Sequence, residues 1–187
     1  MPDKSIVDKS VGLVVMMDIP GIGLVAVLRE RGFFNPEKME PESWPGVCQV
    51  TVHGRLEKNE DFLTALIREL PEELGNDFAS NFISLITLSP ALLGTVSGKT
   101  FYSQEGGKEV VVKEVVTFAI KISPLFLKKI RLAPESGAIR LVSLDEIAKI
   151  VGATPSDKVN GAPDRRIIVM FPDEKTAVVN AFAFVCS

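Results

Sequence analysis

Residues 54–76 read GRLEKNEDFLTALIRELPEELGN, and this stretch carries the signals of a capped amphipathic helix. Asn59 is a candidate N-cap, and the acidic residues after it suit the positive end of a helix dipole. Gly75 followed by Asn76 is a C-terminal stop signal. Between them, aliphatic side chains recur at helical spacing and predict one buried face: Leu63, Leu66, Ile67, Leu70 and Leu74. The sequence therefore predicts a helix that runs to about residue 74.

Three glutamates form a second face of this helix. Glu69, Glu72 and Glu73 stand at i, i+3 and i+4, so they project together beside the aliphatic face. Crowded carboxylates repel one another, and a helix should avoid them unless something compensates. A divalent cation that prefers oxygen ligands, Mg²⁺ or Mn²⁺, would supply that compensation. The alternative is a solvated acidic face, which is the usual state of a glutamate-rich helix.

The spacing of the whole stretch is more particular than its composition. Gly54 is followed by five residues and Glu60, and then by seven residues and RELPEELG over 68–75. This pattern resembles the Nudix box, G-x5-E-x7-R-E-U-x-E-E-x-G-U with U aliphatic, at eight of its nine specified positions. Asn76 departs from the last aliphatic position. Pro71 stands at an unrestricted position but removes a helix hydrogen bond, and a kink there would re-aim the glutamates around it.

The resemblance implies a fold and an activity. The fold class is α/β with mixed α+β character, a Nudix-like α/β/α sandwich in which helices flank a mixed sheet. One Nudix domain would span residues 1–187, with its box at 54–76. The activity would be that of a divalent-metal-dependent pyrophosphohydrolase, in which water attacks phosphorus in a nucleoside diphosphate linked to a variable group. The expected partner is a small nucleotide-like diphosphate substrate, and the expected cofactor is Mg²⁺ or Mn²⁺.

The resemblance also assigns roles to individual positions of the box. Metal binding falls to four of them, namely Gly54 through its carbonyl, Glu69, Glu72 and Glu73. Catalytic roles fall to Glu60, Arg68, Glu69 and Glu72. Within that set, Glu69 or a carboxylate outside the box would help to deprotonate the attacking water. Arg68 would pair with Glu60 or a neighbouring carboxylate and hold the helix and its preceding loop in register.

Candidate substrate-binding residues lie outside the box. Arg29 and Arg31 suit a phosphate, or they are ordinary surface arginines. Trp44 suits stacking on a nucleotide base, or it is a packing anchor beside Pro45. Glu114 lies where some Nudix proteins place an extra metal ligand, or it is a surface charge on a strand edge.

Two alternative functions remain open. The stretches Trp44-Pro45-Gly46 and Gly54-Arg55-Leu56-Glu57 are similar to the Nudix branch of isopentenyl diphosphate isomerase, which would make the protein an isoprenoid-diphosphate isomerase. Against this, His53 precedes the glycine, and Cys48 sits in an apolar strand typical of a buried thiol. The second alternative is a non-catalytic Nudix-fold ligand sensor or binding module. The presence of all three metal-binding glutamates argues against it.

The rest of the chain has mixed strand and helix signals. Strands are predicted at residues 11–17, 24–28, 47–53, 83–88, 110–122 and 140–142. Helices are predicted at 144–151 and 173–183, a loop at 152–163 and a turn at 103–108. Two loops, 32–43 and 89–107, are expected to set substrate selectivity.

The amino-acid composition restricts the expected partners and cellular compartment of the protein. The chain is 46% hydrophobic with a net charge of -3, which argues against a nucleic-acid polymer as partner. Two cysteines are too few for a disulfide framework and fit the cytoplasm. The apolar stretch 11–28 predicts neither a membrane span nor a secretory signal, since it is interrupted by Asp18, Pro20, Gly21 and Gly23. Homodimers are frequent in Nudix proteins, and the sequence leaves a homodimer open.

Overall fold

The computed structural model describes most of the chain, namely residues 6–105, 109–162, 164 and 166–187. It begins with an antiparallel hairpin of β1 (Ile6–Ile19) and β2 (Gly23–Arg31), in which Val15 lies opposite Val27. Gly21 and Gly23 have positive φ in or next to the turn, where a side chain would strain the backbone. The strands predicted at 11–17 and 24–28 are confirmed, and both are longer than expected.

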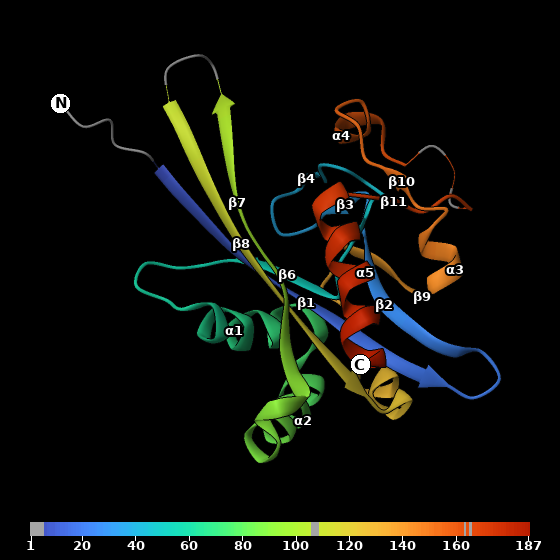
Figure 1. The fold of residues 1–187 in the computed structure, drawn as a ribbon. Helices are drawn as coiled ribbons and strands as arrows, with labels where there is room; N and C mark the ends of the chain where they lie inside the picture. The colour runs from blue at the N-terminus through green and yellow to red at the C-terminus, as the bar shows by residue number, and fades with distance from the viewer. Residues whose placement is uncertain (1–5, 106–108, 163, 165) are drawn as a thin grey trace.

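Two long strands extend the sheet beyond β1. β8 (Glu109–Ile122) runs parallel to β1, and β7 (Leu93–Glu105) runs antiparallel to β8 (Figure 1). The strand predicted at 110–122 is confirmed, whereas β7 occupies most of a segment that was predicted to be loop. Of the turn predicted at 103–108, the last three residues lie outside the described part of the chain, and the first three end β7.

Short strands complete the sheet: β5 (Cys48–Gln49), β6 (Val52–Arg55), β9 (Ser136–Ser143), β10 (Val151–Gly152) and β11 (Val169–Met170). In the described residues the sheet has nine strands, in the order β10-β11-β5-β2-β1-β8-β7, with β6 also paired to β1 and β9 to β2. β3 (Phe34–Asn35) and β4 (Glu40–Pro41) pair separately. The strand predicted at 140–142 is confirmed as part of β9.

The strand predicted at 47–53 is split at Thr51, because β1 and β2 diverge at this point. β5 pairs with β2, and β6 pairs with β1. Between them the buried Thr51 hydroxyl accepts a hydrogen bond from Val15 N at 2.8 Å and donates one to the Val27 carbonyl. One side chain thus bridges the two diverging strands and satisfies backbone groups that would otherwise be unpaired. The fork brings His53 and Gly54 to the middle of the sheet.

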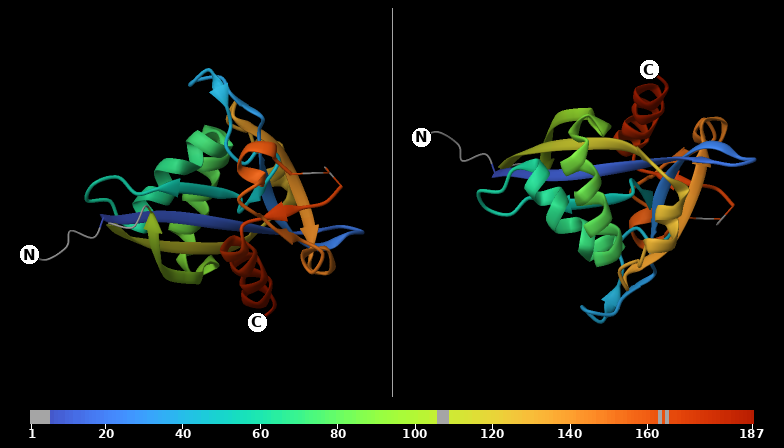
Figure 2. Two further views of the ribbon diagram at one scale, coloured as in Figure 1. Left: turned by 90° about the horizontal axis from the view of Figure 1, so that it is seen from above. Right: turned by 90° about the horizontal axis from the view of Figure 1, so that it is seen from below.

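Helices cover both faces of the sheet. α1 (Phe62–Leu74) and α2 (Asn76–Leu88) lie on one face, and α5 (Pro172–Cys186) lies on the other (Figure 2). Alternate residues of β1 enter the two cores: Val11, Leu13, Val15 and Met17 face α1, whereas Val14 and Met16 face α5. The α/β/α sandwich with a mixed sheet is therefore confirmed, as is the helix predicted at 173–183.

The remaining helices are short, and one of them is shorter than the sequence predicted. They are η1 (Pro90–Leu92), η2 (Pro124–Lys129), α3 (Leu144–Ile147) and α4 (Asp157–Asn160). The helix predicted at 144–151 is wrong beyond Ile147, because Val151 already belongs to β10. The loop predicted at 152–163 contains α4. None of the helices in the described residues is both long and apolar enough to cross a membrane.

The strand predicted at 83–88 is wrong, because this segment is the second half of α2. The buried side chains of α2 include Phe78, Phe82 and Ile86, which recur every four residues as a helix requires. The N-cap of α1 is Asp61 and not Asn59, since the Asp61 carboxylate accepts from Thr64 N at 2.8 Å. Asn59 has a φ of 68° and forms part of the preceding loop.

Candidate active site

Arg68 ties α1 to the loop that precedes it. Its Nε and Nη2 donate to the two carboxylate oxygens of Glu60 at 3.0 and 3.1 Å. Nη2 also donates to the Arg55 carbonyl at 2.7 Å, and Nη1 donates to Glu69 Oε1 at 2.8 Å. The fork of Arg68 lowers the pKa of Glu60, while Glu60 and Glu69 raise the pKa of Arg68. One guanidinium therefore fixes the loop, the helix and the Glu69 carboxylate relative to one another.

Gly54 and Glu69 form the closest approach between β6 and α1. A Cβ atom on Gly54 would overlap the Cγ, Cδ and Oε1 atoms of Glu69, so any side chain at this position would displace the Glu69 carboxylate. The Glu69 side chain is largely buried as a result. Burial raises the pKa of Glu69, although the hydrogen bond and the charge of Arg68 oppose that shift. Glu69 is thus a desolvated carboxylate that is held in place on two sides.

Glu73 lies one turn further along α1 and meets a different arginine. Its carboxylate is in ion-pair contact with the Arg29 guanidinium, and both side chains are buried. Arg29 Nη1 donates to Ser136 Oγ at 2.9 Å and also contacts Glu73 Oε2 in the ion pair, but Arg29 Nε lacks a hydrogen-bond partner. Burial raises the pKa of Glu73 to about 7 against the attraction of Arg29. This buried pair is incompletely satisfied, which is unusual for groups so poorly hydrated.

Glu72 differs from the other two glutamates because its side chain points to solvent. The side chain is 61% exposed, and its ion pair is a long one of 3.8 Å to Arg68. Across the described residues, no three His, Cys, Asp or Glu side chains lie close enough together to hold a metal ion. The structure thus brings Glu69 against Gly54 and places Glu73 nearby on the same buried side of α1. It does not bring Glu72 to them.

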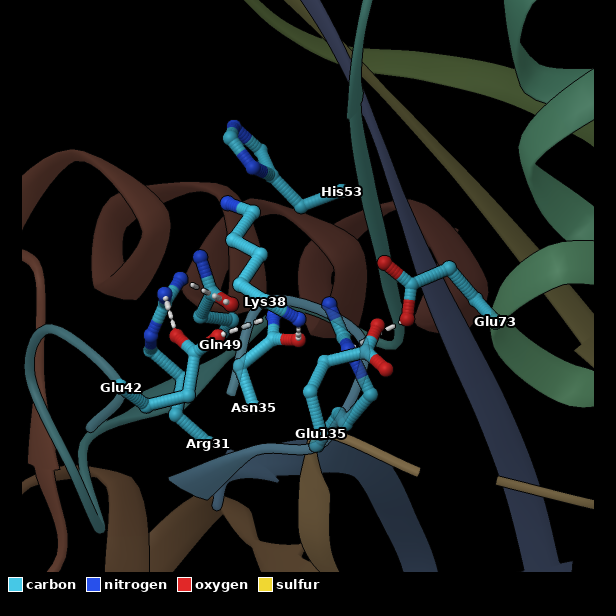
Figure 3. A pocket seen from close by; sticks show the side chains of 9 residues that line it. Arg31, Asn35, Lys38, Glu42, Gln49, His53, Glu73 and Glu135 are labelled. Carbon is cyan, nitrogen blue, oxygen red and sulfur yellow. Dashed lines mark hydrogen bonds and ion pairs between the residues drawn. The ribbon is translucent and has the colours of Figure 1, made fainter. Parts of the chain in front are cut away.

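Two neighbouring cavities open beside these glutamates. Cavity 1, of about 210 Å³, is lined by Arg29, Arg31, Asn35, Lys38, Glu42, Gln49, His53, Glu73 and Glu135 (Figure 3). Cavity 2, of about 540 Å³, is lined by residues that include Trp44, Gly54, Glu69, Phe171, Asp173 and Glu174. Both are lined by Arg31, Gln49 and His53. The Glu73 carboxylate therefore faces the smaller chamber and the Glu69 carboxylate the larger one.

Comparison with known proteins shows which solved structures have a similar fold. No family model matches the sequence, and no curated protein matches it. Solved structures do match: a MutT/nudix family protein from Enterococcus faecalis has a TM-score of 0.61 at 13% identity, over 100% of this chain and 64% of that one. The chain has the Nudix fold. A C. elegans Ap4A hydrolase in a binary complex has a TM-score of 0.54 at 16% identity, over 96% of this chain and 98% of that one.

A third match is the NUDIX domain of Shewanella oneidensis NrtR complexed with ADP ribose. Its TM-score is 0.54 at 11% identity, over 98% of this chain and 90% of that one. At such low identities these matches establish the Nudix fold, and the residues of the site must be judged from this chain itself.

The departures from the Nudix box have local explanations in the structure. α1 runs unbroken through Pro71, so the proline does not divide the helix. Asn76 is exposed and begins α2, where a polar residue replaces the aliphatic one. Gly75 has a φ of 86°, and a Cβ there would lie 2.9 Å from Arg131 Cβ. The Arg131 amide in turn donates to the last carbonyl of α1, at Leu74, at 2.8 Å.

The residues proposed outside the Nudix box lie in different settings. Arg29 and Arg31 both line cavity 1, and Arg31 donates to Glu42 Oε2 at 2.5 Å. Trp44 lines cavity 2 and packs edge-to-face on Phe171, with ring centroids 5.1 Å apart. Glu114 lines neither cavity and pairs with Lys9 on the adjacent strand at 3.0 Å.

Sequence reasoning missed Glu174, a buried carboxylate of cavity 2. Its Oε2 accepts from Val50 N at 2.8 Å, across 124 residues of sequence. Burial raises its pKa to about 8, so it is largely protonated at neutral pH. In the sequence this residue looks like an ordinary acidic group in the first turn of a helix. Only the long-range pairing with the β5–β6 segment distinguishes it.

Proposed function

We propose that this protein is a Nudix hydrolase that cleaves a diphosphate bond in a nucleoside diphosphate linked to a variable group. The observation that carries the proposal is the locked set of Glu60, Arg68, Glu69 and Gly54, on a chain with the Nudix fold. The Ap4A hydrolase and the domain bound to ADP ribose are matches whose ligands contain such a bond. Under this proposal residues 1–187 form one Nudix domain with its box at 54–76.

A divalent cation, Mg²⁺ or Mn²⁺, is part of the proposal. Two of the donors are oxygens of the kind that the ion prefers: Glu69 and Glu73 are buried carboxylates with raised pKa values, although Glu73 is paired with Arg29 in the structure. These two residues and the Gly54 carbonyl would hold the ion, and Glu72, whose side chain points to solvent in the structure, would have to turn toward them to join the set. Bound there, the ion would neutralise charge on the phosphate oxygens.

The side chains of the box have separable tasks. Glu69 is desolvated and anchored by Arg68, which suits a group that takes a proton from water. Arg68 is a positioning residue, since it holds Glu69 and bonds to Glu60 and the Arg55 carbonyl. Gly54 has no side chain, so the Glu69 carboxylate can lie against β6. A carboxylate outside the box remains the alternative proton acceptor.

Cavity 2 is the proposed site of the nucleoside. Trp44 and Phe171 provide aromatic surface, and Asp173 and Glu174 provide polar groups for the edge of a base. A protonated Glu174 both donates and accepts, which an ionised carboxylate cannot do. This arrangement supports a nucleotide over an isoprenoid, whose apolar chain would meet mainly polar groups here. Cytoplasmic location and a homodimer stay predictions.

The isomerase alternative is not favoured by the setting of Cys48. This thiol is buried in β5, and burial raises its pKa to about 12, which keeps it protonated and unreactive. The sensor alternative would keep ligand binding without turnover, so it is an outcome of the following experiment.

The test is release of phosphate or nucleotide with Mg²⁺, Mn²⁺ or EDTA. The substrates are nucleoside triphosphates, ADP-ribose, sugar nucleotides, dinucleoside polyphosphates and isopentenyl diphosphate. We expect metal-dependent turnover, and a loss of kcat of about 10² or more in Glu69→Gln and in Glu72→Gln. Glu40→Gln, at an exposed glutamate in β4, is the control. Ligand binding without turnover of any substrate would instead favour the sensor, and full activity in Glu72→Gln would remove that residue from the site.

A further inference from the structure

Cavity 1 is a second polar chamber beside the site that the proposed function uses. It lies between the end of β2, residues 35–42 of the following loop and the end of α1, and its lining side chains converge from these separate segments (Figure 3). Its volume of about 210 Å³ is less than half that of cavity 2. It is too small for a nucleoside, but it has room for a small charged group.

The acidic side of this chamber is already engaged for the most part. Glu42 Oε1 accepts from Asn35 Nδ2 at 2.8 Å, and Oε2 accepts from Arg31 Nη2 at 2.5 Å. Although burial opposes it, these bonds hold the pKa of Glu42 below its usual value. Glu73 is paired with Arg29. Glu135 is the remaining carboxylate, and it raises the pKa of Glu73 from its end of the chamber.

The basic side, by contrast, keeps unused donors. Arg29 is 5% exposed and lines the chamber; its Nε is sealed from solvent without a hydrogen-bond partner, and its Nη2 makes no hydrogen bond within the described residues. Lys38 makes no ion pair within the described residues, and its side chain extends over the chamber toward His53 (Figure 3). A buried donor without an acceptor costs free energy on the order of 1–3 kcal/mol. The Nη2 group of Arg29 and the exposed Lys38 ammonium group, whose charge also acts on Glu42, are the donors that an anionic oxygen in this chamber would contact.

We propose that cavity 1 is an oxyanion subsite for a phosphate or carboxylate group, held by Lys38 and the Arg29 Nη2 group. The subsite itself follows from these donors. The identity of the molecule that carries the group rests on the proposed function: the oxyanion belongs to the part of the substrate beyond the scissile diphosphate, while the nucleoside occupies cavity 2. The shared lining by Arg31, Gln49 and His53 makes the two chambers accessible to one molecule. Substrates with a charged terminal group are therefore favoured over neutral ones.

The first test measures the subsite without any reaction. Inorganic phosphate and acetate are titrated into the protein in EDTA, which keeps divalent metal out of the result. Binding is followed in ¹H–¹⁵N spectra by the Arg29 Nε–H signal and the Lys38 amide. We expect both signals to shift with saturation, and Lys38→Met to weaken phosphate about tenfold. Lys128→Met is the matched control, because Lys128 is an exposed lysine on η2.

A second variant separates an electrostatic subsite from a structural role for Lys38. Glu135→Gln removes the opposing carboxylate, so it should tighten phosphate binding severalfold, which damage to the fold cannot do. An Arg29 Nε–H signal that does not move, or Lys38→Met and Lys128→Met with equal affinities, would overturn the subsite whatever the enzyme assays show.

The last test identifies the source of the oxyanion. Matched substrates are UDP-glucose against UDP-glucuronate for a carboxylate, and ATP against adenosine tetraphosphate for a phosphate. For the pair that the protein hydrolyses, we expect the member with the additional anionic group to have the lower KM, and Lys38→Met to raise only that KM, by about tenfold, with kcat unchanged. Equal KM changes for both members would refute the link to substrate. Hydrolysis of neither pair, with phosphate still bound, would count against the proposed function and not against the subsite.

Discussion

Replacing Glu174 by glutamine should remove a pH dependence of stability that this residue imposes on the fold. Glu174 is buried at the start of α5, and it accepts a hydrogen bond from Val50 N at 2.8 Å. Burial raises its pKa from 4.5 to about 8. Glutamine has nearly the same shape and keeps a carbonyl oxygen for the Val50 amide, but it does not titrate. Glu174→Gln therefore removes the titrating group and changes little else.

The sign of the effect follows from proton linkage. Between pH 4.5 and about 8 the folded protein keeps a proton on Glu174 that the unfolded chain has released. The free energy of unfolding must then fall as pH rises through this range, by at most about 1.4 kcal/mol per pH unit. From pH 5 to pH 8 the wild type should lose about 3 kcal/mol relative to Glu174→Gln. Below pH 4.5 this contribution is constant, because both states are protonated.

Urea unfolding at several pH values between 5 and 8, in EDTA, measures this difference. Trp44 is the only tryptophan and packs on Phe171, so its fluorescence reports unfolding close to the changed residue. Glu73 also has a raised pKa, but it is present in both proteins and cancels in the difference. Glu40→Gln, an exposed glutamate, controls for the loss of one negative charge. Parallel curves for the wild type and Glu174→Gln would refute the assignment of a proton to Glu174.

Three further predictions concern the Nudix box. Gly54→Ala should lower kcat at least about 10²-fold while the circular dichroism spectrum stays unchanged, because its Cβ displaces the Glu69 carboxylate. Arg68→Lys should lower the urea concentration at the midpoint of unfolding, since lysine cannot make the paired hydrogen bonds to Glu60. Pro71→Ala should raise stability by about 1–3 kcal/mol, because it restores a hydrogen bond inside α1; a lower melting temperature would contradict this.

The geometry around Arg68 was predictable from sequence because its side-chain contacts within the box are short-range. Glu60, Arg68 and Glu69 lie within ten residues of one another, and their spacing sets which side of α1 they share. Gly54 is fixed by the same helix, since Glu69 fills the space that a side chain would need. A pattern of residue types at fixed spacing therefore encodes these contacts directly.

The cavities could not be predicted in this way, because their walls come from distant segments. Glu174 reaches Val50 across 124 residues, and Arg29 reaches Ser136 across 107. Neither pairing leaves a periodic signal in the sequence. The prediction of a strand at 83–88 was wrong because the apolar residues of this segment continue a helical series. That series begins at Phe78, five residues before the predicted strand.

The crowding of glutamates on α1 is resolved by the protein more fully than the sequence suggested. Repulsion among three carboxylates predicted a compensating cation, but it could not tell a metal ion from an arginine. In the structure Arg68 bonds Glu69 and Arg29 pairs with Glu73, while Glu72 lies in solvent. The Arg29–Glu73 pair is buried and incompletely hydrogen-bonded, and such pairs contribute little net stability. A cation that draws on Glu73 Oε2 therefore competes with a weak partner. The acidic helix face is therefore arginine-paired in the structure, and the metal that the proposed function requires would have to displace Arg29 from Glu73.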